Sequence, residues 1–182
     1  MEKTLKQFEQ VIQECRIVYQ NKMKDYGLAW RILRISSLTD QIYIKANRIR
    51  SIQQKGQQKV EEGIKPEFIG IVNYSVMALI QLELGIADEP DLEAERALNL
   101  YDKYIYGARD LMMNKNYDYD EAWRNMRVSS LTDIILMKLH RIKQIEDNGG
   151  EAVFSEGLDA NYNDIVNYAI FALIRIMEET EQ

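Results

Sequence analysis

"NKMKDYGLAWRILRISSLTD" at residues 21–40 and "NKNYDYDEAWRNMRVSSLTD" at residues 114–133 are two versions of one segment, 93 residues apart. The similarity continues downstream: after a one-residue insertion, the IVNY at 71–74 recurs at 165–168. The chain therefore divides into a first repeat, about 1–87, and a second repeat, 91–182. We expect the two repeats to pack into one compact unit.

Few residues in either repeat would interrupt a helix. The 182 residues include two prolines and nine glycines, and apolar residues recur at helical spacing. The class predicted is all-α, with two tandem three-helix repeats packed as a pseudo-two-fold helical bundle, like a homodimer fused into one chain. A homodimer of the whole chain is also left open. The helices are expected at about 3–22, 37–54 and 67–84, and again at 92–114, 130–146 and 162–179.

The composition narrows the functional classes. A formal charge of −6 and a pI near 5.0 give no strong nucleic-acid signal. The single Cys15 cannot form an internal disulfide, and no apolar leader segment begins the chain, so a cytoplasmic location is expected. The longest apolar run, at 165–174, contains Asn167 and Tyr168 and is too short to span a membrane.

The repeated SLTD at 37–40 and 130–133 is typical of a helix start. The Ser hydroxyl and the Asp carboxylate of such a capping box accept hydrogen bonds from free N–H groups of the first turn. We therefore predict helix starts at Ser37 and Ser130, and this part of the repeat needs no functional explanation.

Lys45 and Lys138 stand at the same repeat position, each in the middle of an apolar helical stripe. Leu38, Ile42 and Ile49 form that stripe around Lys45. Because an unpaired ammonium is costly to bury, such a lysine must extend to solvent, pair with a carboxylate or bind an anionic ligand. The sequence leaves all three open.

Asn73 and Asn167 pose a similar problem in the apolar third helix of each repeat, where a buried amide needs hydrogen-bond partners. A helix-to-helix hydrogen bond is one explanation. In the second repeat, Asp164 lies one turn before Asn167, and Glu156 is near in sequence, which suggests a weak site for Mg²⁺. Gly70 replaces that Asp in the first repeat.

Charge and aromatic residues favour a phosphate-bearing ligand. Residues 21–50 contain seven Lys or Arg against two Asp, and residues 114–143 contain six against four Asp or Glu. Arginines spaced i, i+3 could clamp a phosphate or form surface pairs, and a Trp or Tyr beside them could stack on a base or belong to the core. The candidates are Arg31, Arg34, Trp30, Tyr26 and Tyr74, with Arg124, Arg127, Trp123, Tyr119 and Tyr168.

Several common chemistries have no support. The sequence contains no nucleophile–base arrangement, no Gly-rich phosphate loop and no Cys/His spacing typical of zinc.

The combined pattern N-K-x-x-D-Y-G-x-A-W-R-x-x-R, then S-L-T-D-x-I-x-x-K-x-x-R-I and D-I-x-N-Y, resembles the nucleotide modification associated domain 1 family, over nearly the whole chain and in two copies. The resemblance implies a link to nucleotide or DNA-base modification. The sequence departs from the family pattern at Gly70 and at Asp120. The residues that match it are Asp25, Tyr26, Trp30, Arg31, Lys45, Arg48, Asn73 and Tyr74, then Asp118, Tyr119, Trp123, Arg124, Lys138, Arg141, Asp164, Asn167 and Tyr168.

The chain is also similar, more remotely, to the MazG-like all-α nucleoside triphosphate pyrophosphohydrolases, whose carboxylates hold Mg²⁺. Their paired E-x-x-E motifs are absent, and Asp164 with Asn167 is a partial match. We therefore expect a nucleotide-binding or nucleotide-processing protein, with pyrophosphohydrolysis as the first reaction to test. The alternative is a non-catalytic helical scaffold whose repeated polar residues are caps and buried ion pairs.

Overall fold

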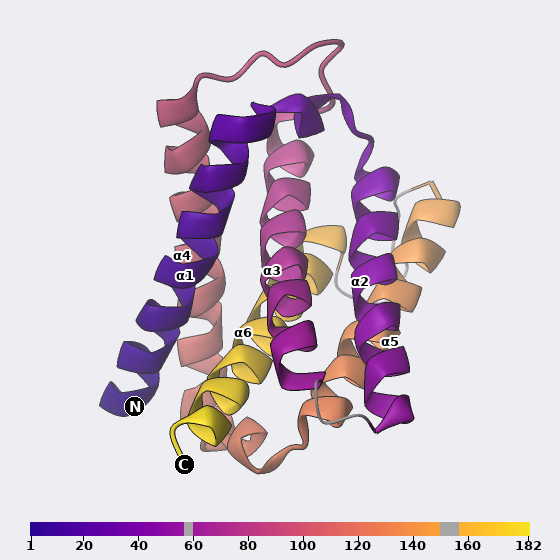
Figure 1. Cartoon of the computed structure of the whole chain (residues 1–182). Coiled ribbons are helices and arrows are strands. Elements are labelled where there is room, and N and C mark those ends of the chain that lie inside the picture. Colours follow the sequence, from indigo (N-terminus) through magenta and orange to yellow (C-terminus); the bar gives the residue numbers. More distant parts are fainter. Residues whose placement is uncertain (57–59, 150–156) are drawn as a thin grey trace.

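The computed structural model describes residues 1–56, 60–149 and 157–182, with the side chains of 60–62 left out of that description. These residues are helical without any strand, as the sequence predicts (Figure 1). The helices are α1 (Glu2–Tyr26), α2 (Ile35–Lys55), α3 (Val60–Leu84), α4 (Ala94–Tyr119), α5 (Val128–Asp147) and α6 (Leu158–Thr180). Two 3₁₀ helices, η1 (Ala29–Ile32) and η2 (Ala122–Asn125), follow the first helix of each repeat.

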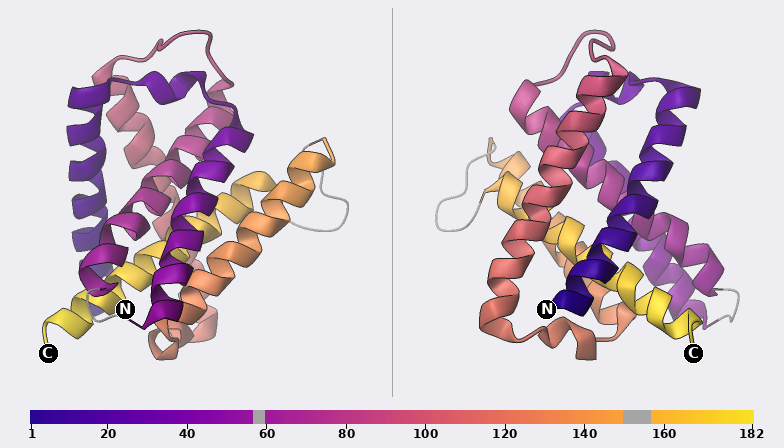
Figure 2. Two further views of the ribbon diagram at one scale, coloured as in Figure 1. Left: turned by 45° about the vertical axis from the view of Figure 1, so that its right-hand side comes forward. Right: turned by 90° about the vertical axis from the view of Figure 1, so that its left-hand side faces the viewer.

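The six helices pack as a pseudo-two-fold bundle. Helices α3 and α6 cross at its centre, with α2 and α5 against them on one side and α1 and α4 on the other (Figure 2). η1 and the linker between the repeats lie at one end of the bundle, and η2 and both chain termini lie at the other (Figure 1). The corresponding segments of the two repeats therefore lie at opposite ends.

The third helices of the two repeats, α3 and α6, together supply about half of the core residues. Side chains of α6 are buried almost all round the helix, and one continuous apolar core includes residues of both repeats. By length and composition, residues Gly63–Leu84 of α3 could cross a membrane, but 61% of that apolar window is buried inside the bundle. Aromatic rings join the repeats across the core: Tyr19 stacks on Tyr101, and Phe8 meets Phe171 edge to face.

The capping-box prediction for the SLTD segments is wrong. Helix α2 has Arg34 at its N-cap and α5 has Arg127, and neither start has a side-chain cap. Arg34 and Arg127 have extended backbone conformations, and the helices begin directly after them, at Ile35 and Val128. Each helix therefore starts two residues before the predicted serine, which lies inside the first turn and not at the N-cap. The threonine of each SLTD instead lies at the α2–α5 contact, where Thr39 donates to Glu146 and Thr132 accepts from Gln53.

Candidate functional site

Each 3₁₀ helix is held by a side chain from the end of the third helix of its repeat. Gln81 Nε2 donates to the carbonyl oxygens of Arg31 and Leu33, at 3.0 and 2.8 Å. At the corresponding position of the second repeat, Arg175 donates to the carbonyls of Arg124 and Met126. The sequence around Ala-Trp-Arg therefore folds into a rigid corner, which fixes the tryptophan and the arginine that follow the first helix.

The arginines of these corners are used in internal contacts. Arg31 is buried, pairs with Asp91 at 2.9 Å, and also donates to Gln81 and to the carbonyl of Gly85. This arrangement ties the linker between the repeats to the first corner. In the second repeat, Arg124 pairs with Glu178 at 3.1 Å and with Glu121 at 3.2 Å. Neither guanidinium lines any of the cavities described below. The structure thus places both of these predicted phosphate ligands in ion pairs.

The second repeat contains a cavity of about 520 Å³ between α4, η2, α5 and α6. This "second pocket" brings together residues that lie far apart in the sequence. Four of its twelve lining residues are aromatic, and its charged and amide side chains come from α4, α5 and α6. It is lined by Met112, Lys115, Asn116, Tyr119, Ala122, Trp123, Met126, Lys138, Asp164, Asn167, Tyr168 and Phe171.

Two lysines converge on one carboxylate in this pocket. Lys115 Nζ lies 2.8 Å from Asp164 Oδ1, and Lys138 Nζ lies 2.9 Å from Oδ2. Asp164 is buried except for 12% of its side chain, whereas Lys115 is half-exposed. Two ammonium groups therefore lie side by side at one carboxylate, and ammonium groups are donors that can bind an anion. Lys115 was not among the candidates predicted from the sequence, although it stands at the same position of the quoted segments as Lys22.

The aromatic rings that line the second pocket differ in how accessible they are to a ligand. The Trp123 ring stacks on Phe171, with centroids 4.3 Å apart, and the Arg124 guanidinium lies 4.5 Å from the centre of the same ring. Since Trp123 is covered in this way and only 5% exposed, it offers an edge to the pocket. Tyr119 is 72% exposed and Tyr168 is half-buried, so these two rings are the ones that a planar ligand can reach.

The buried asparagines make the helix-to-helix hydrogen bonds that were one explanation of their burial. Asn73 Nδ2 donates to the carbonyl of Cys15 and Asn167 Nδ2 to that of Ala108, at 3.0 and 2.9 Å. Asn73 Oδ1 also accepts from Tyr101, at 2.7 Å. Among the described residues, Asn167 Oδ1 has no such donor.

The first repeat pairs its lysine differently. Lys45 Nζ lies 3.4 Å from Glu67 and 5.8 Å from the centre of the Tyr74 ring, and Arg48 pairs with Glu67 at 3.0 Å. The Lys45 side chain crosses Gly70 so closely that a Cβ atom there would lie 2.6 Å from Lys45 Cε. This close approach explains a glycine in the middle of a helix, where it costs about 1 kcal/mol relative to alanine.

The remaining candidates lie outside the pocket. Asp25, Arg34, Asp118 and Arg127 are exposed on the surface, as is Tyr26, which borders the cavity of the first repeat. Arg141 is half-buried on α5, one turn beyond Lys138. Glu156 lies outside the described residues.

The predicted metal ligand Asp164 lies in ion pairs rather than in a cluster of acidic side chains, as far as the described residues show. None of the described residues belongs to a group of three or more His, Cys, Asp or Glu side chains placed to hold a metal. Asp164, the predicted metal ligand, has each carboxylate oxygen paired with an ammonium. A magnesium ion in this pocket would therefore depend on oxygen ligands that come with the bound molecule.

Comparison with known proteins identifies the family. The model of nucleotide modification associated domain 1 matches residues 22–82 and residues 115–176, one match in each repeat. The chain belongs to this family. No curated protein and no solved structure has significant similarity to the chain. In each repeat, the matched segment runs from the lysine near the end of the first helix to a point close to the end of the third helix.

Proposed function

We propose that the second pocket binds a nucleotide or a related phosphorylated small molecule. The observation that carries the proposal is the convergence of Lys115 and Lys138 on Asp164 beside the accessible rings of Tyr119 and Tyr168. The cavity of about 520 Å³ is in the range of sites for small organic ligands. The family description, which associates the domain with nucleotide modification, supports the same ligand class.

Each part of the ligand would meet a matching group. The phosphate would lie at the ammonium groups of Lys115 and Lys138, which bind anionic oxygen atoms by charge-assisted hydrogen bonds. The base would stack on Tyr119 or Tyr168, because the Trp123 ring is already covered by its neighbours. A ribose hydroxyl or an exocyclic amine would donate to Asp164. Magnesium would enter with the phosphates of the ligand.

The test is a binding titration that reports on this pocket alone. Met112 and Met126 line the second pocket, so the protein is labelled with ¹³C-methyl methionine and titrated with nucleoside mono- and triphosphates, with and without Mg²⁺. Lys138→Met is the test variant, and Lys45→Met, at the same position of the first repeat, is the matched control. We expect Lys138→Met to weaken binding at least about fivefold, because one ammonium is lost, while Lys45→Met stays within about twofold of the original protein.

Two results would contradict the proposal: no nucleotide that shifts the Met112 or Met126 signals, or equal affinities for Lys138→Met and the original protein. Release of pyrophosphate from the triphosphates in the same samples tests catalysis separately.

A second candidate function is a non-catalytic scaffold, which is favoured by the internal ion pairs of Arg31, Arg124 and Lys45. It predicts that Lys138→Met unfolds at the same temperature or higher, since apolar replacement of a buried pair is often neutral or stabilising, and that no ligand response is lost. Thermal unfolding of both variants, measured with the titration, separates the two functions.

A further inference from the structure

The first repeat has a hollow of its own at the opposite end of the bundle, between α1, α3 and η1. It consists of two adjoining cavities of about 390 and 520 Å³, which share Tyr19, Lys22, Tyr74 and Met77. We call it the first pocket. Every residue that lines the smaller cavity, except Gly27, stands at the repeat position of a residue that lines the second pocket. Those residues are Tyr19, Lys22, Met23, Tyr26, Ala29, Trp30, Tyr74 and Met77.

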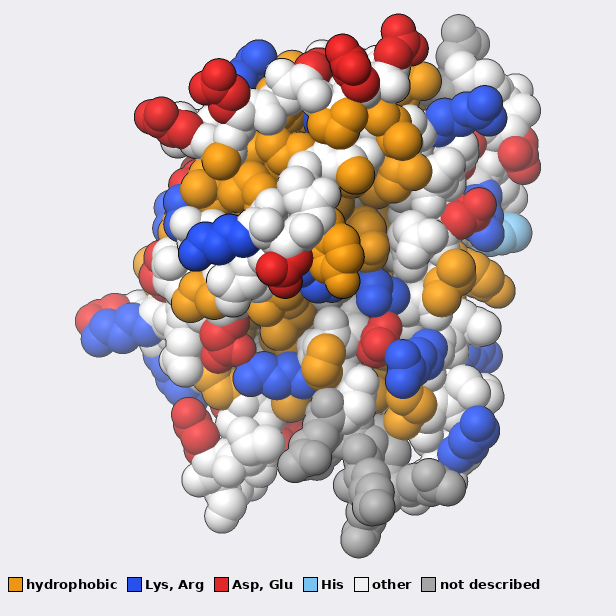
Figure 3. Space-filling view, turned by 45° about the horizontal axis from the view of Figure 1, so that its top comes forward, with side chains coloured by type: hydrophobic (Ala, Val, Ile, Leu, Met, Phe, Trp, Pro, Cys, Tyr) orange, Lys and Arg blue, Asp and Glu red, His pale blue; other side chains and the backbone are white. Residues whose placement is uncertain are grey.

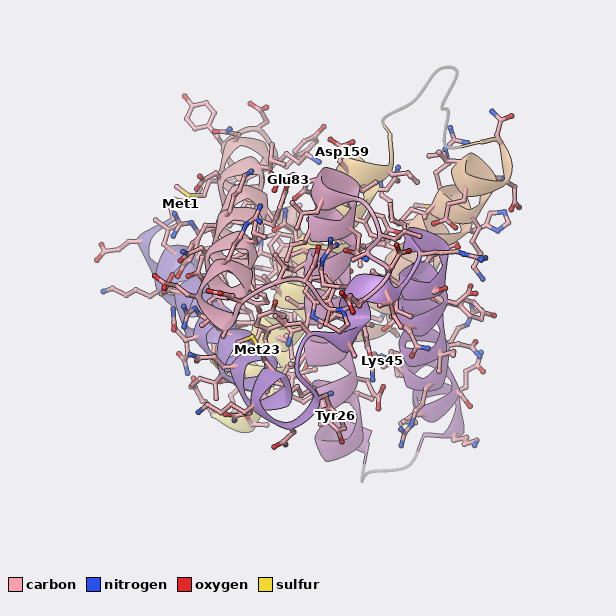
Figure 4. All side chains as sticks on the ribbon, turned by 90° about the horizontal axis from the view of Figure 1, so that it is seen from above. Met1, Met23, Tyr26, Lys45, Glu83 and Asp159 are labelled. Atoms are coloured by element: carbon pink, nitrogen blue, oxygen red, sulfur yellow. The ribbon has the colours of Figure 1, made fainter. Side chains whose placement is uncertain are left out.

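The larger cavity extends this hollow along α1 and α3 and is mainly apolar. Ile17, Val18, Ile69 and Pro66 line it, and Ile17 is 55% exposed. In Figure 3, hydrophobic side chains are gathered on the upper part of the molecular face, and Lys and Arg side chains lie singly among them. Viewed from above, Met23 and Tyr26 mark the end of α1 at this hollow (Figure 4).

The first pocket differs from the second in its charges. In the second pocket Lys115 pairs with Asp164, but Gly70 stands at the corresponding position of the first. Lys22, the counterpart of Lys115, consequently has no carboxylate partner among the residues that the structure describes. The lysine of α2 is also absent from the lining, because Lys45 turns to Glu67. The other charged groups in the lining, Lys65 and Glu14, pair with each other at 3.0 Å.

We propose that the first pocket is also a binding site, but for a different class of ligand than the second pocket. Its ligand would be a largely apolar, aromatic molecule with a single anionic group. The apolar and aromatic walls would hold its body, and Lys22 would pair with its charge. A triphosphate does not suit this site, because Lys22 is the one lining ammonium without a carboxylate partner among the described residues. This proposal concerns the first pocket and stands independently of nucleotide binding in the second.

The experiment compares two probes that share an aromatic body and differ in charge. They are 1-anilinonaphthalene-8-sulfonate, a monoanion, and N-phenyl-1-naphthylamine, which is neutral. Binding is followed by the ¹³C-methyl signals of Met23 and Met77, which line the first pocket, with Met112 and Met126 as reporters of the second. The test variant is Lys22→Gln, and the control is Lys24→Gln, an exposed lysine of the same helix turn that does not line the pocket.

Gly70→Asp is a second test: it adds a negative charge to the first pocket, whereas Lys22→Gln removes a positive charge from it. It would place a carboxylate where Asp164 stands in the other repeat, and the Lys45 atoms that it meets belong to the end of a flexible side chain. We expect Lys22→Gln and Gly70→Asp each to weaken binding of the sulfonate about fivefold. Binding of the neutral probe should be unchanged in Lys22→Gln, and Lys24→Gln should behave as the original protein.

The proposal would be overturned if the sulfonate left the Met23 and Met77 signals unmoved, or if Lys22→Gln and Lys24→Gln bound it equally. Because the nucleotide titration is read at Met112 and Met126, failure of one proposal is distinguishable from failure of the other. Thermal unfolding of each variant confirms that the probes meet a folded protein.

Discussion

Each repeat has an acidic residue on its third helix that pairs with the lysine of its second helix, but the position of this acidic residue differs by one helical turn between the repeats. In the first repeat, Glu67 is present and Gly70 follows it; in the second, Asn161 and Asp164 occupy the same two positions. Each repeat still pairs its helical lysine with a carboxylate, Lys45 with Glu67 and Lys138 with Asp164. The shift of one turn decides whether that carboxylate also meets the lysine at the end of the first helix. The same scaffold can therefore present two pockets of different charge.

The two repeats also use different residues to hold the corner formed by the 3₁₀ helix of each repeat. Gln81 and Arg175 perform one structural task, but Gln81 is buried and also accepts from Arg31, whereas Arg175 is partly exposed and pairs with Glu179. The first corner thus depends on a neutral buried group, and the second on a charged group near water. Removing each group tests how equivalent the corners are.

The largest expected effect is that of Gln81→Ala. Gln81 is 1% exposed, and its loss leaves buried carbonyl oxygens of η1 without their donor and takes an acceptor from Arg31. We expect the free energy of unfolding to fall by about 2–3 kcal/mol, measured by urea denaturation.

Arg175→Ala is the matched change in the second repeat. Water can reach the carbonyls that this partly exposed side chain leaves behind, so the loss should be clearly smaller than that of Gln81→Ala. Equal losses for the two variants would show that burial does not distinguish the two corners.

The next effect concerns the hydrogen bond from Tyr101 to Asn73. Burial raises the pKa of Tyr101 well above its usual value, so its hydroxyl keeps its proton and donates. Tyr101→Phe leaves Asn73 Oδ1 buried without this donor, and Asn167 Oδ1 is in the same position with respect to the residues that the structure describes. We expect this variant to lose about 1–2 kcal/mol of stability in the same denaturation experiment.

Phe8 offers the reciprocal test, since it stands at the repeat position of Tyr101. Its ring lies against Phe171, one turn along α6 from Asn167. Phe8→Tyr would supply the missing donor, so we expect no loss of stability and a gain of up to about 1 kcal/mol. A marked destabilisation would show that the packing around Phe8 has no room for a hydroxyl.

The helices and the repeat could be predicted because they depend on local pattern: apolar residues recur at helical spacing, and few residues interrupt it. The partners of the polar residues could not be predicted. Lys45 was left with three explanations, because its pairing with Glu67 depends on how α3 is rotated against α2. Arg31 pairs with Asp91, 60 residues away in a linker whose path the sequence pattern does not specify.

The SLTD prediction failed for a related reason. A capping box is a local pattern, but a threonine can equally serve a contact between two helices. Thr39 and Thr132 do so, in two contacts related by the pseudo-two-fold axis: Thr39 with Glu146, and Thr132 with Gln53. The pairs differ in charge, and this difference leads to the smallest of the expected effects.

Glu146→Gln makes the two contacts alike. Burial raises the pKa of Glu146, and Asp40 and Asp147 raise it further, while the hydrogen bonds from Thr39 and Tyr162 lower it by a smaller amount. A carboxyl whose pKa is higher in the folded protein than in the unfolded chain binds its proton more tightly when folded. Its contribution to stability therefore declines as the pH rises from the unfolded value, about 4.3, through the raised folded value.

The glutamine variant has no charge to bury, and its amide can donate to Thr39 as Gln53 donates to Thr132. We expect it to be modestly more stable than the original protein at pH 7, with the difference shrinking toward zero as the pH falls to about 4. Urea denaturation of both proteins across this range measures the difference directly and cancels the pH dependence of the other carboxylates. Gln53→Glu should show the opposite trend, losing stability as the pH rises. A constant difference between Glu146→Gln and the original protein at every pH would mean that the charge of Glu146 is not what separates the two contacts.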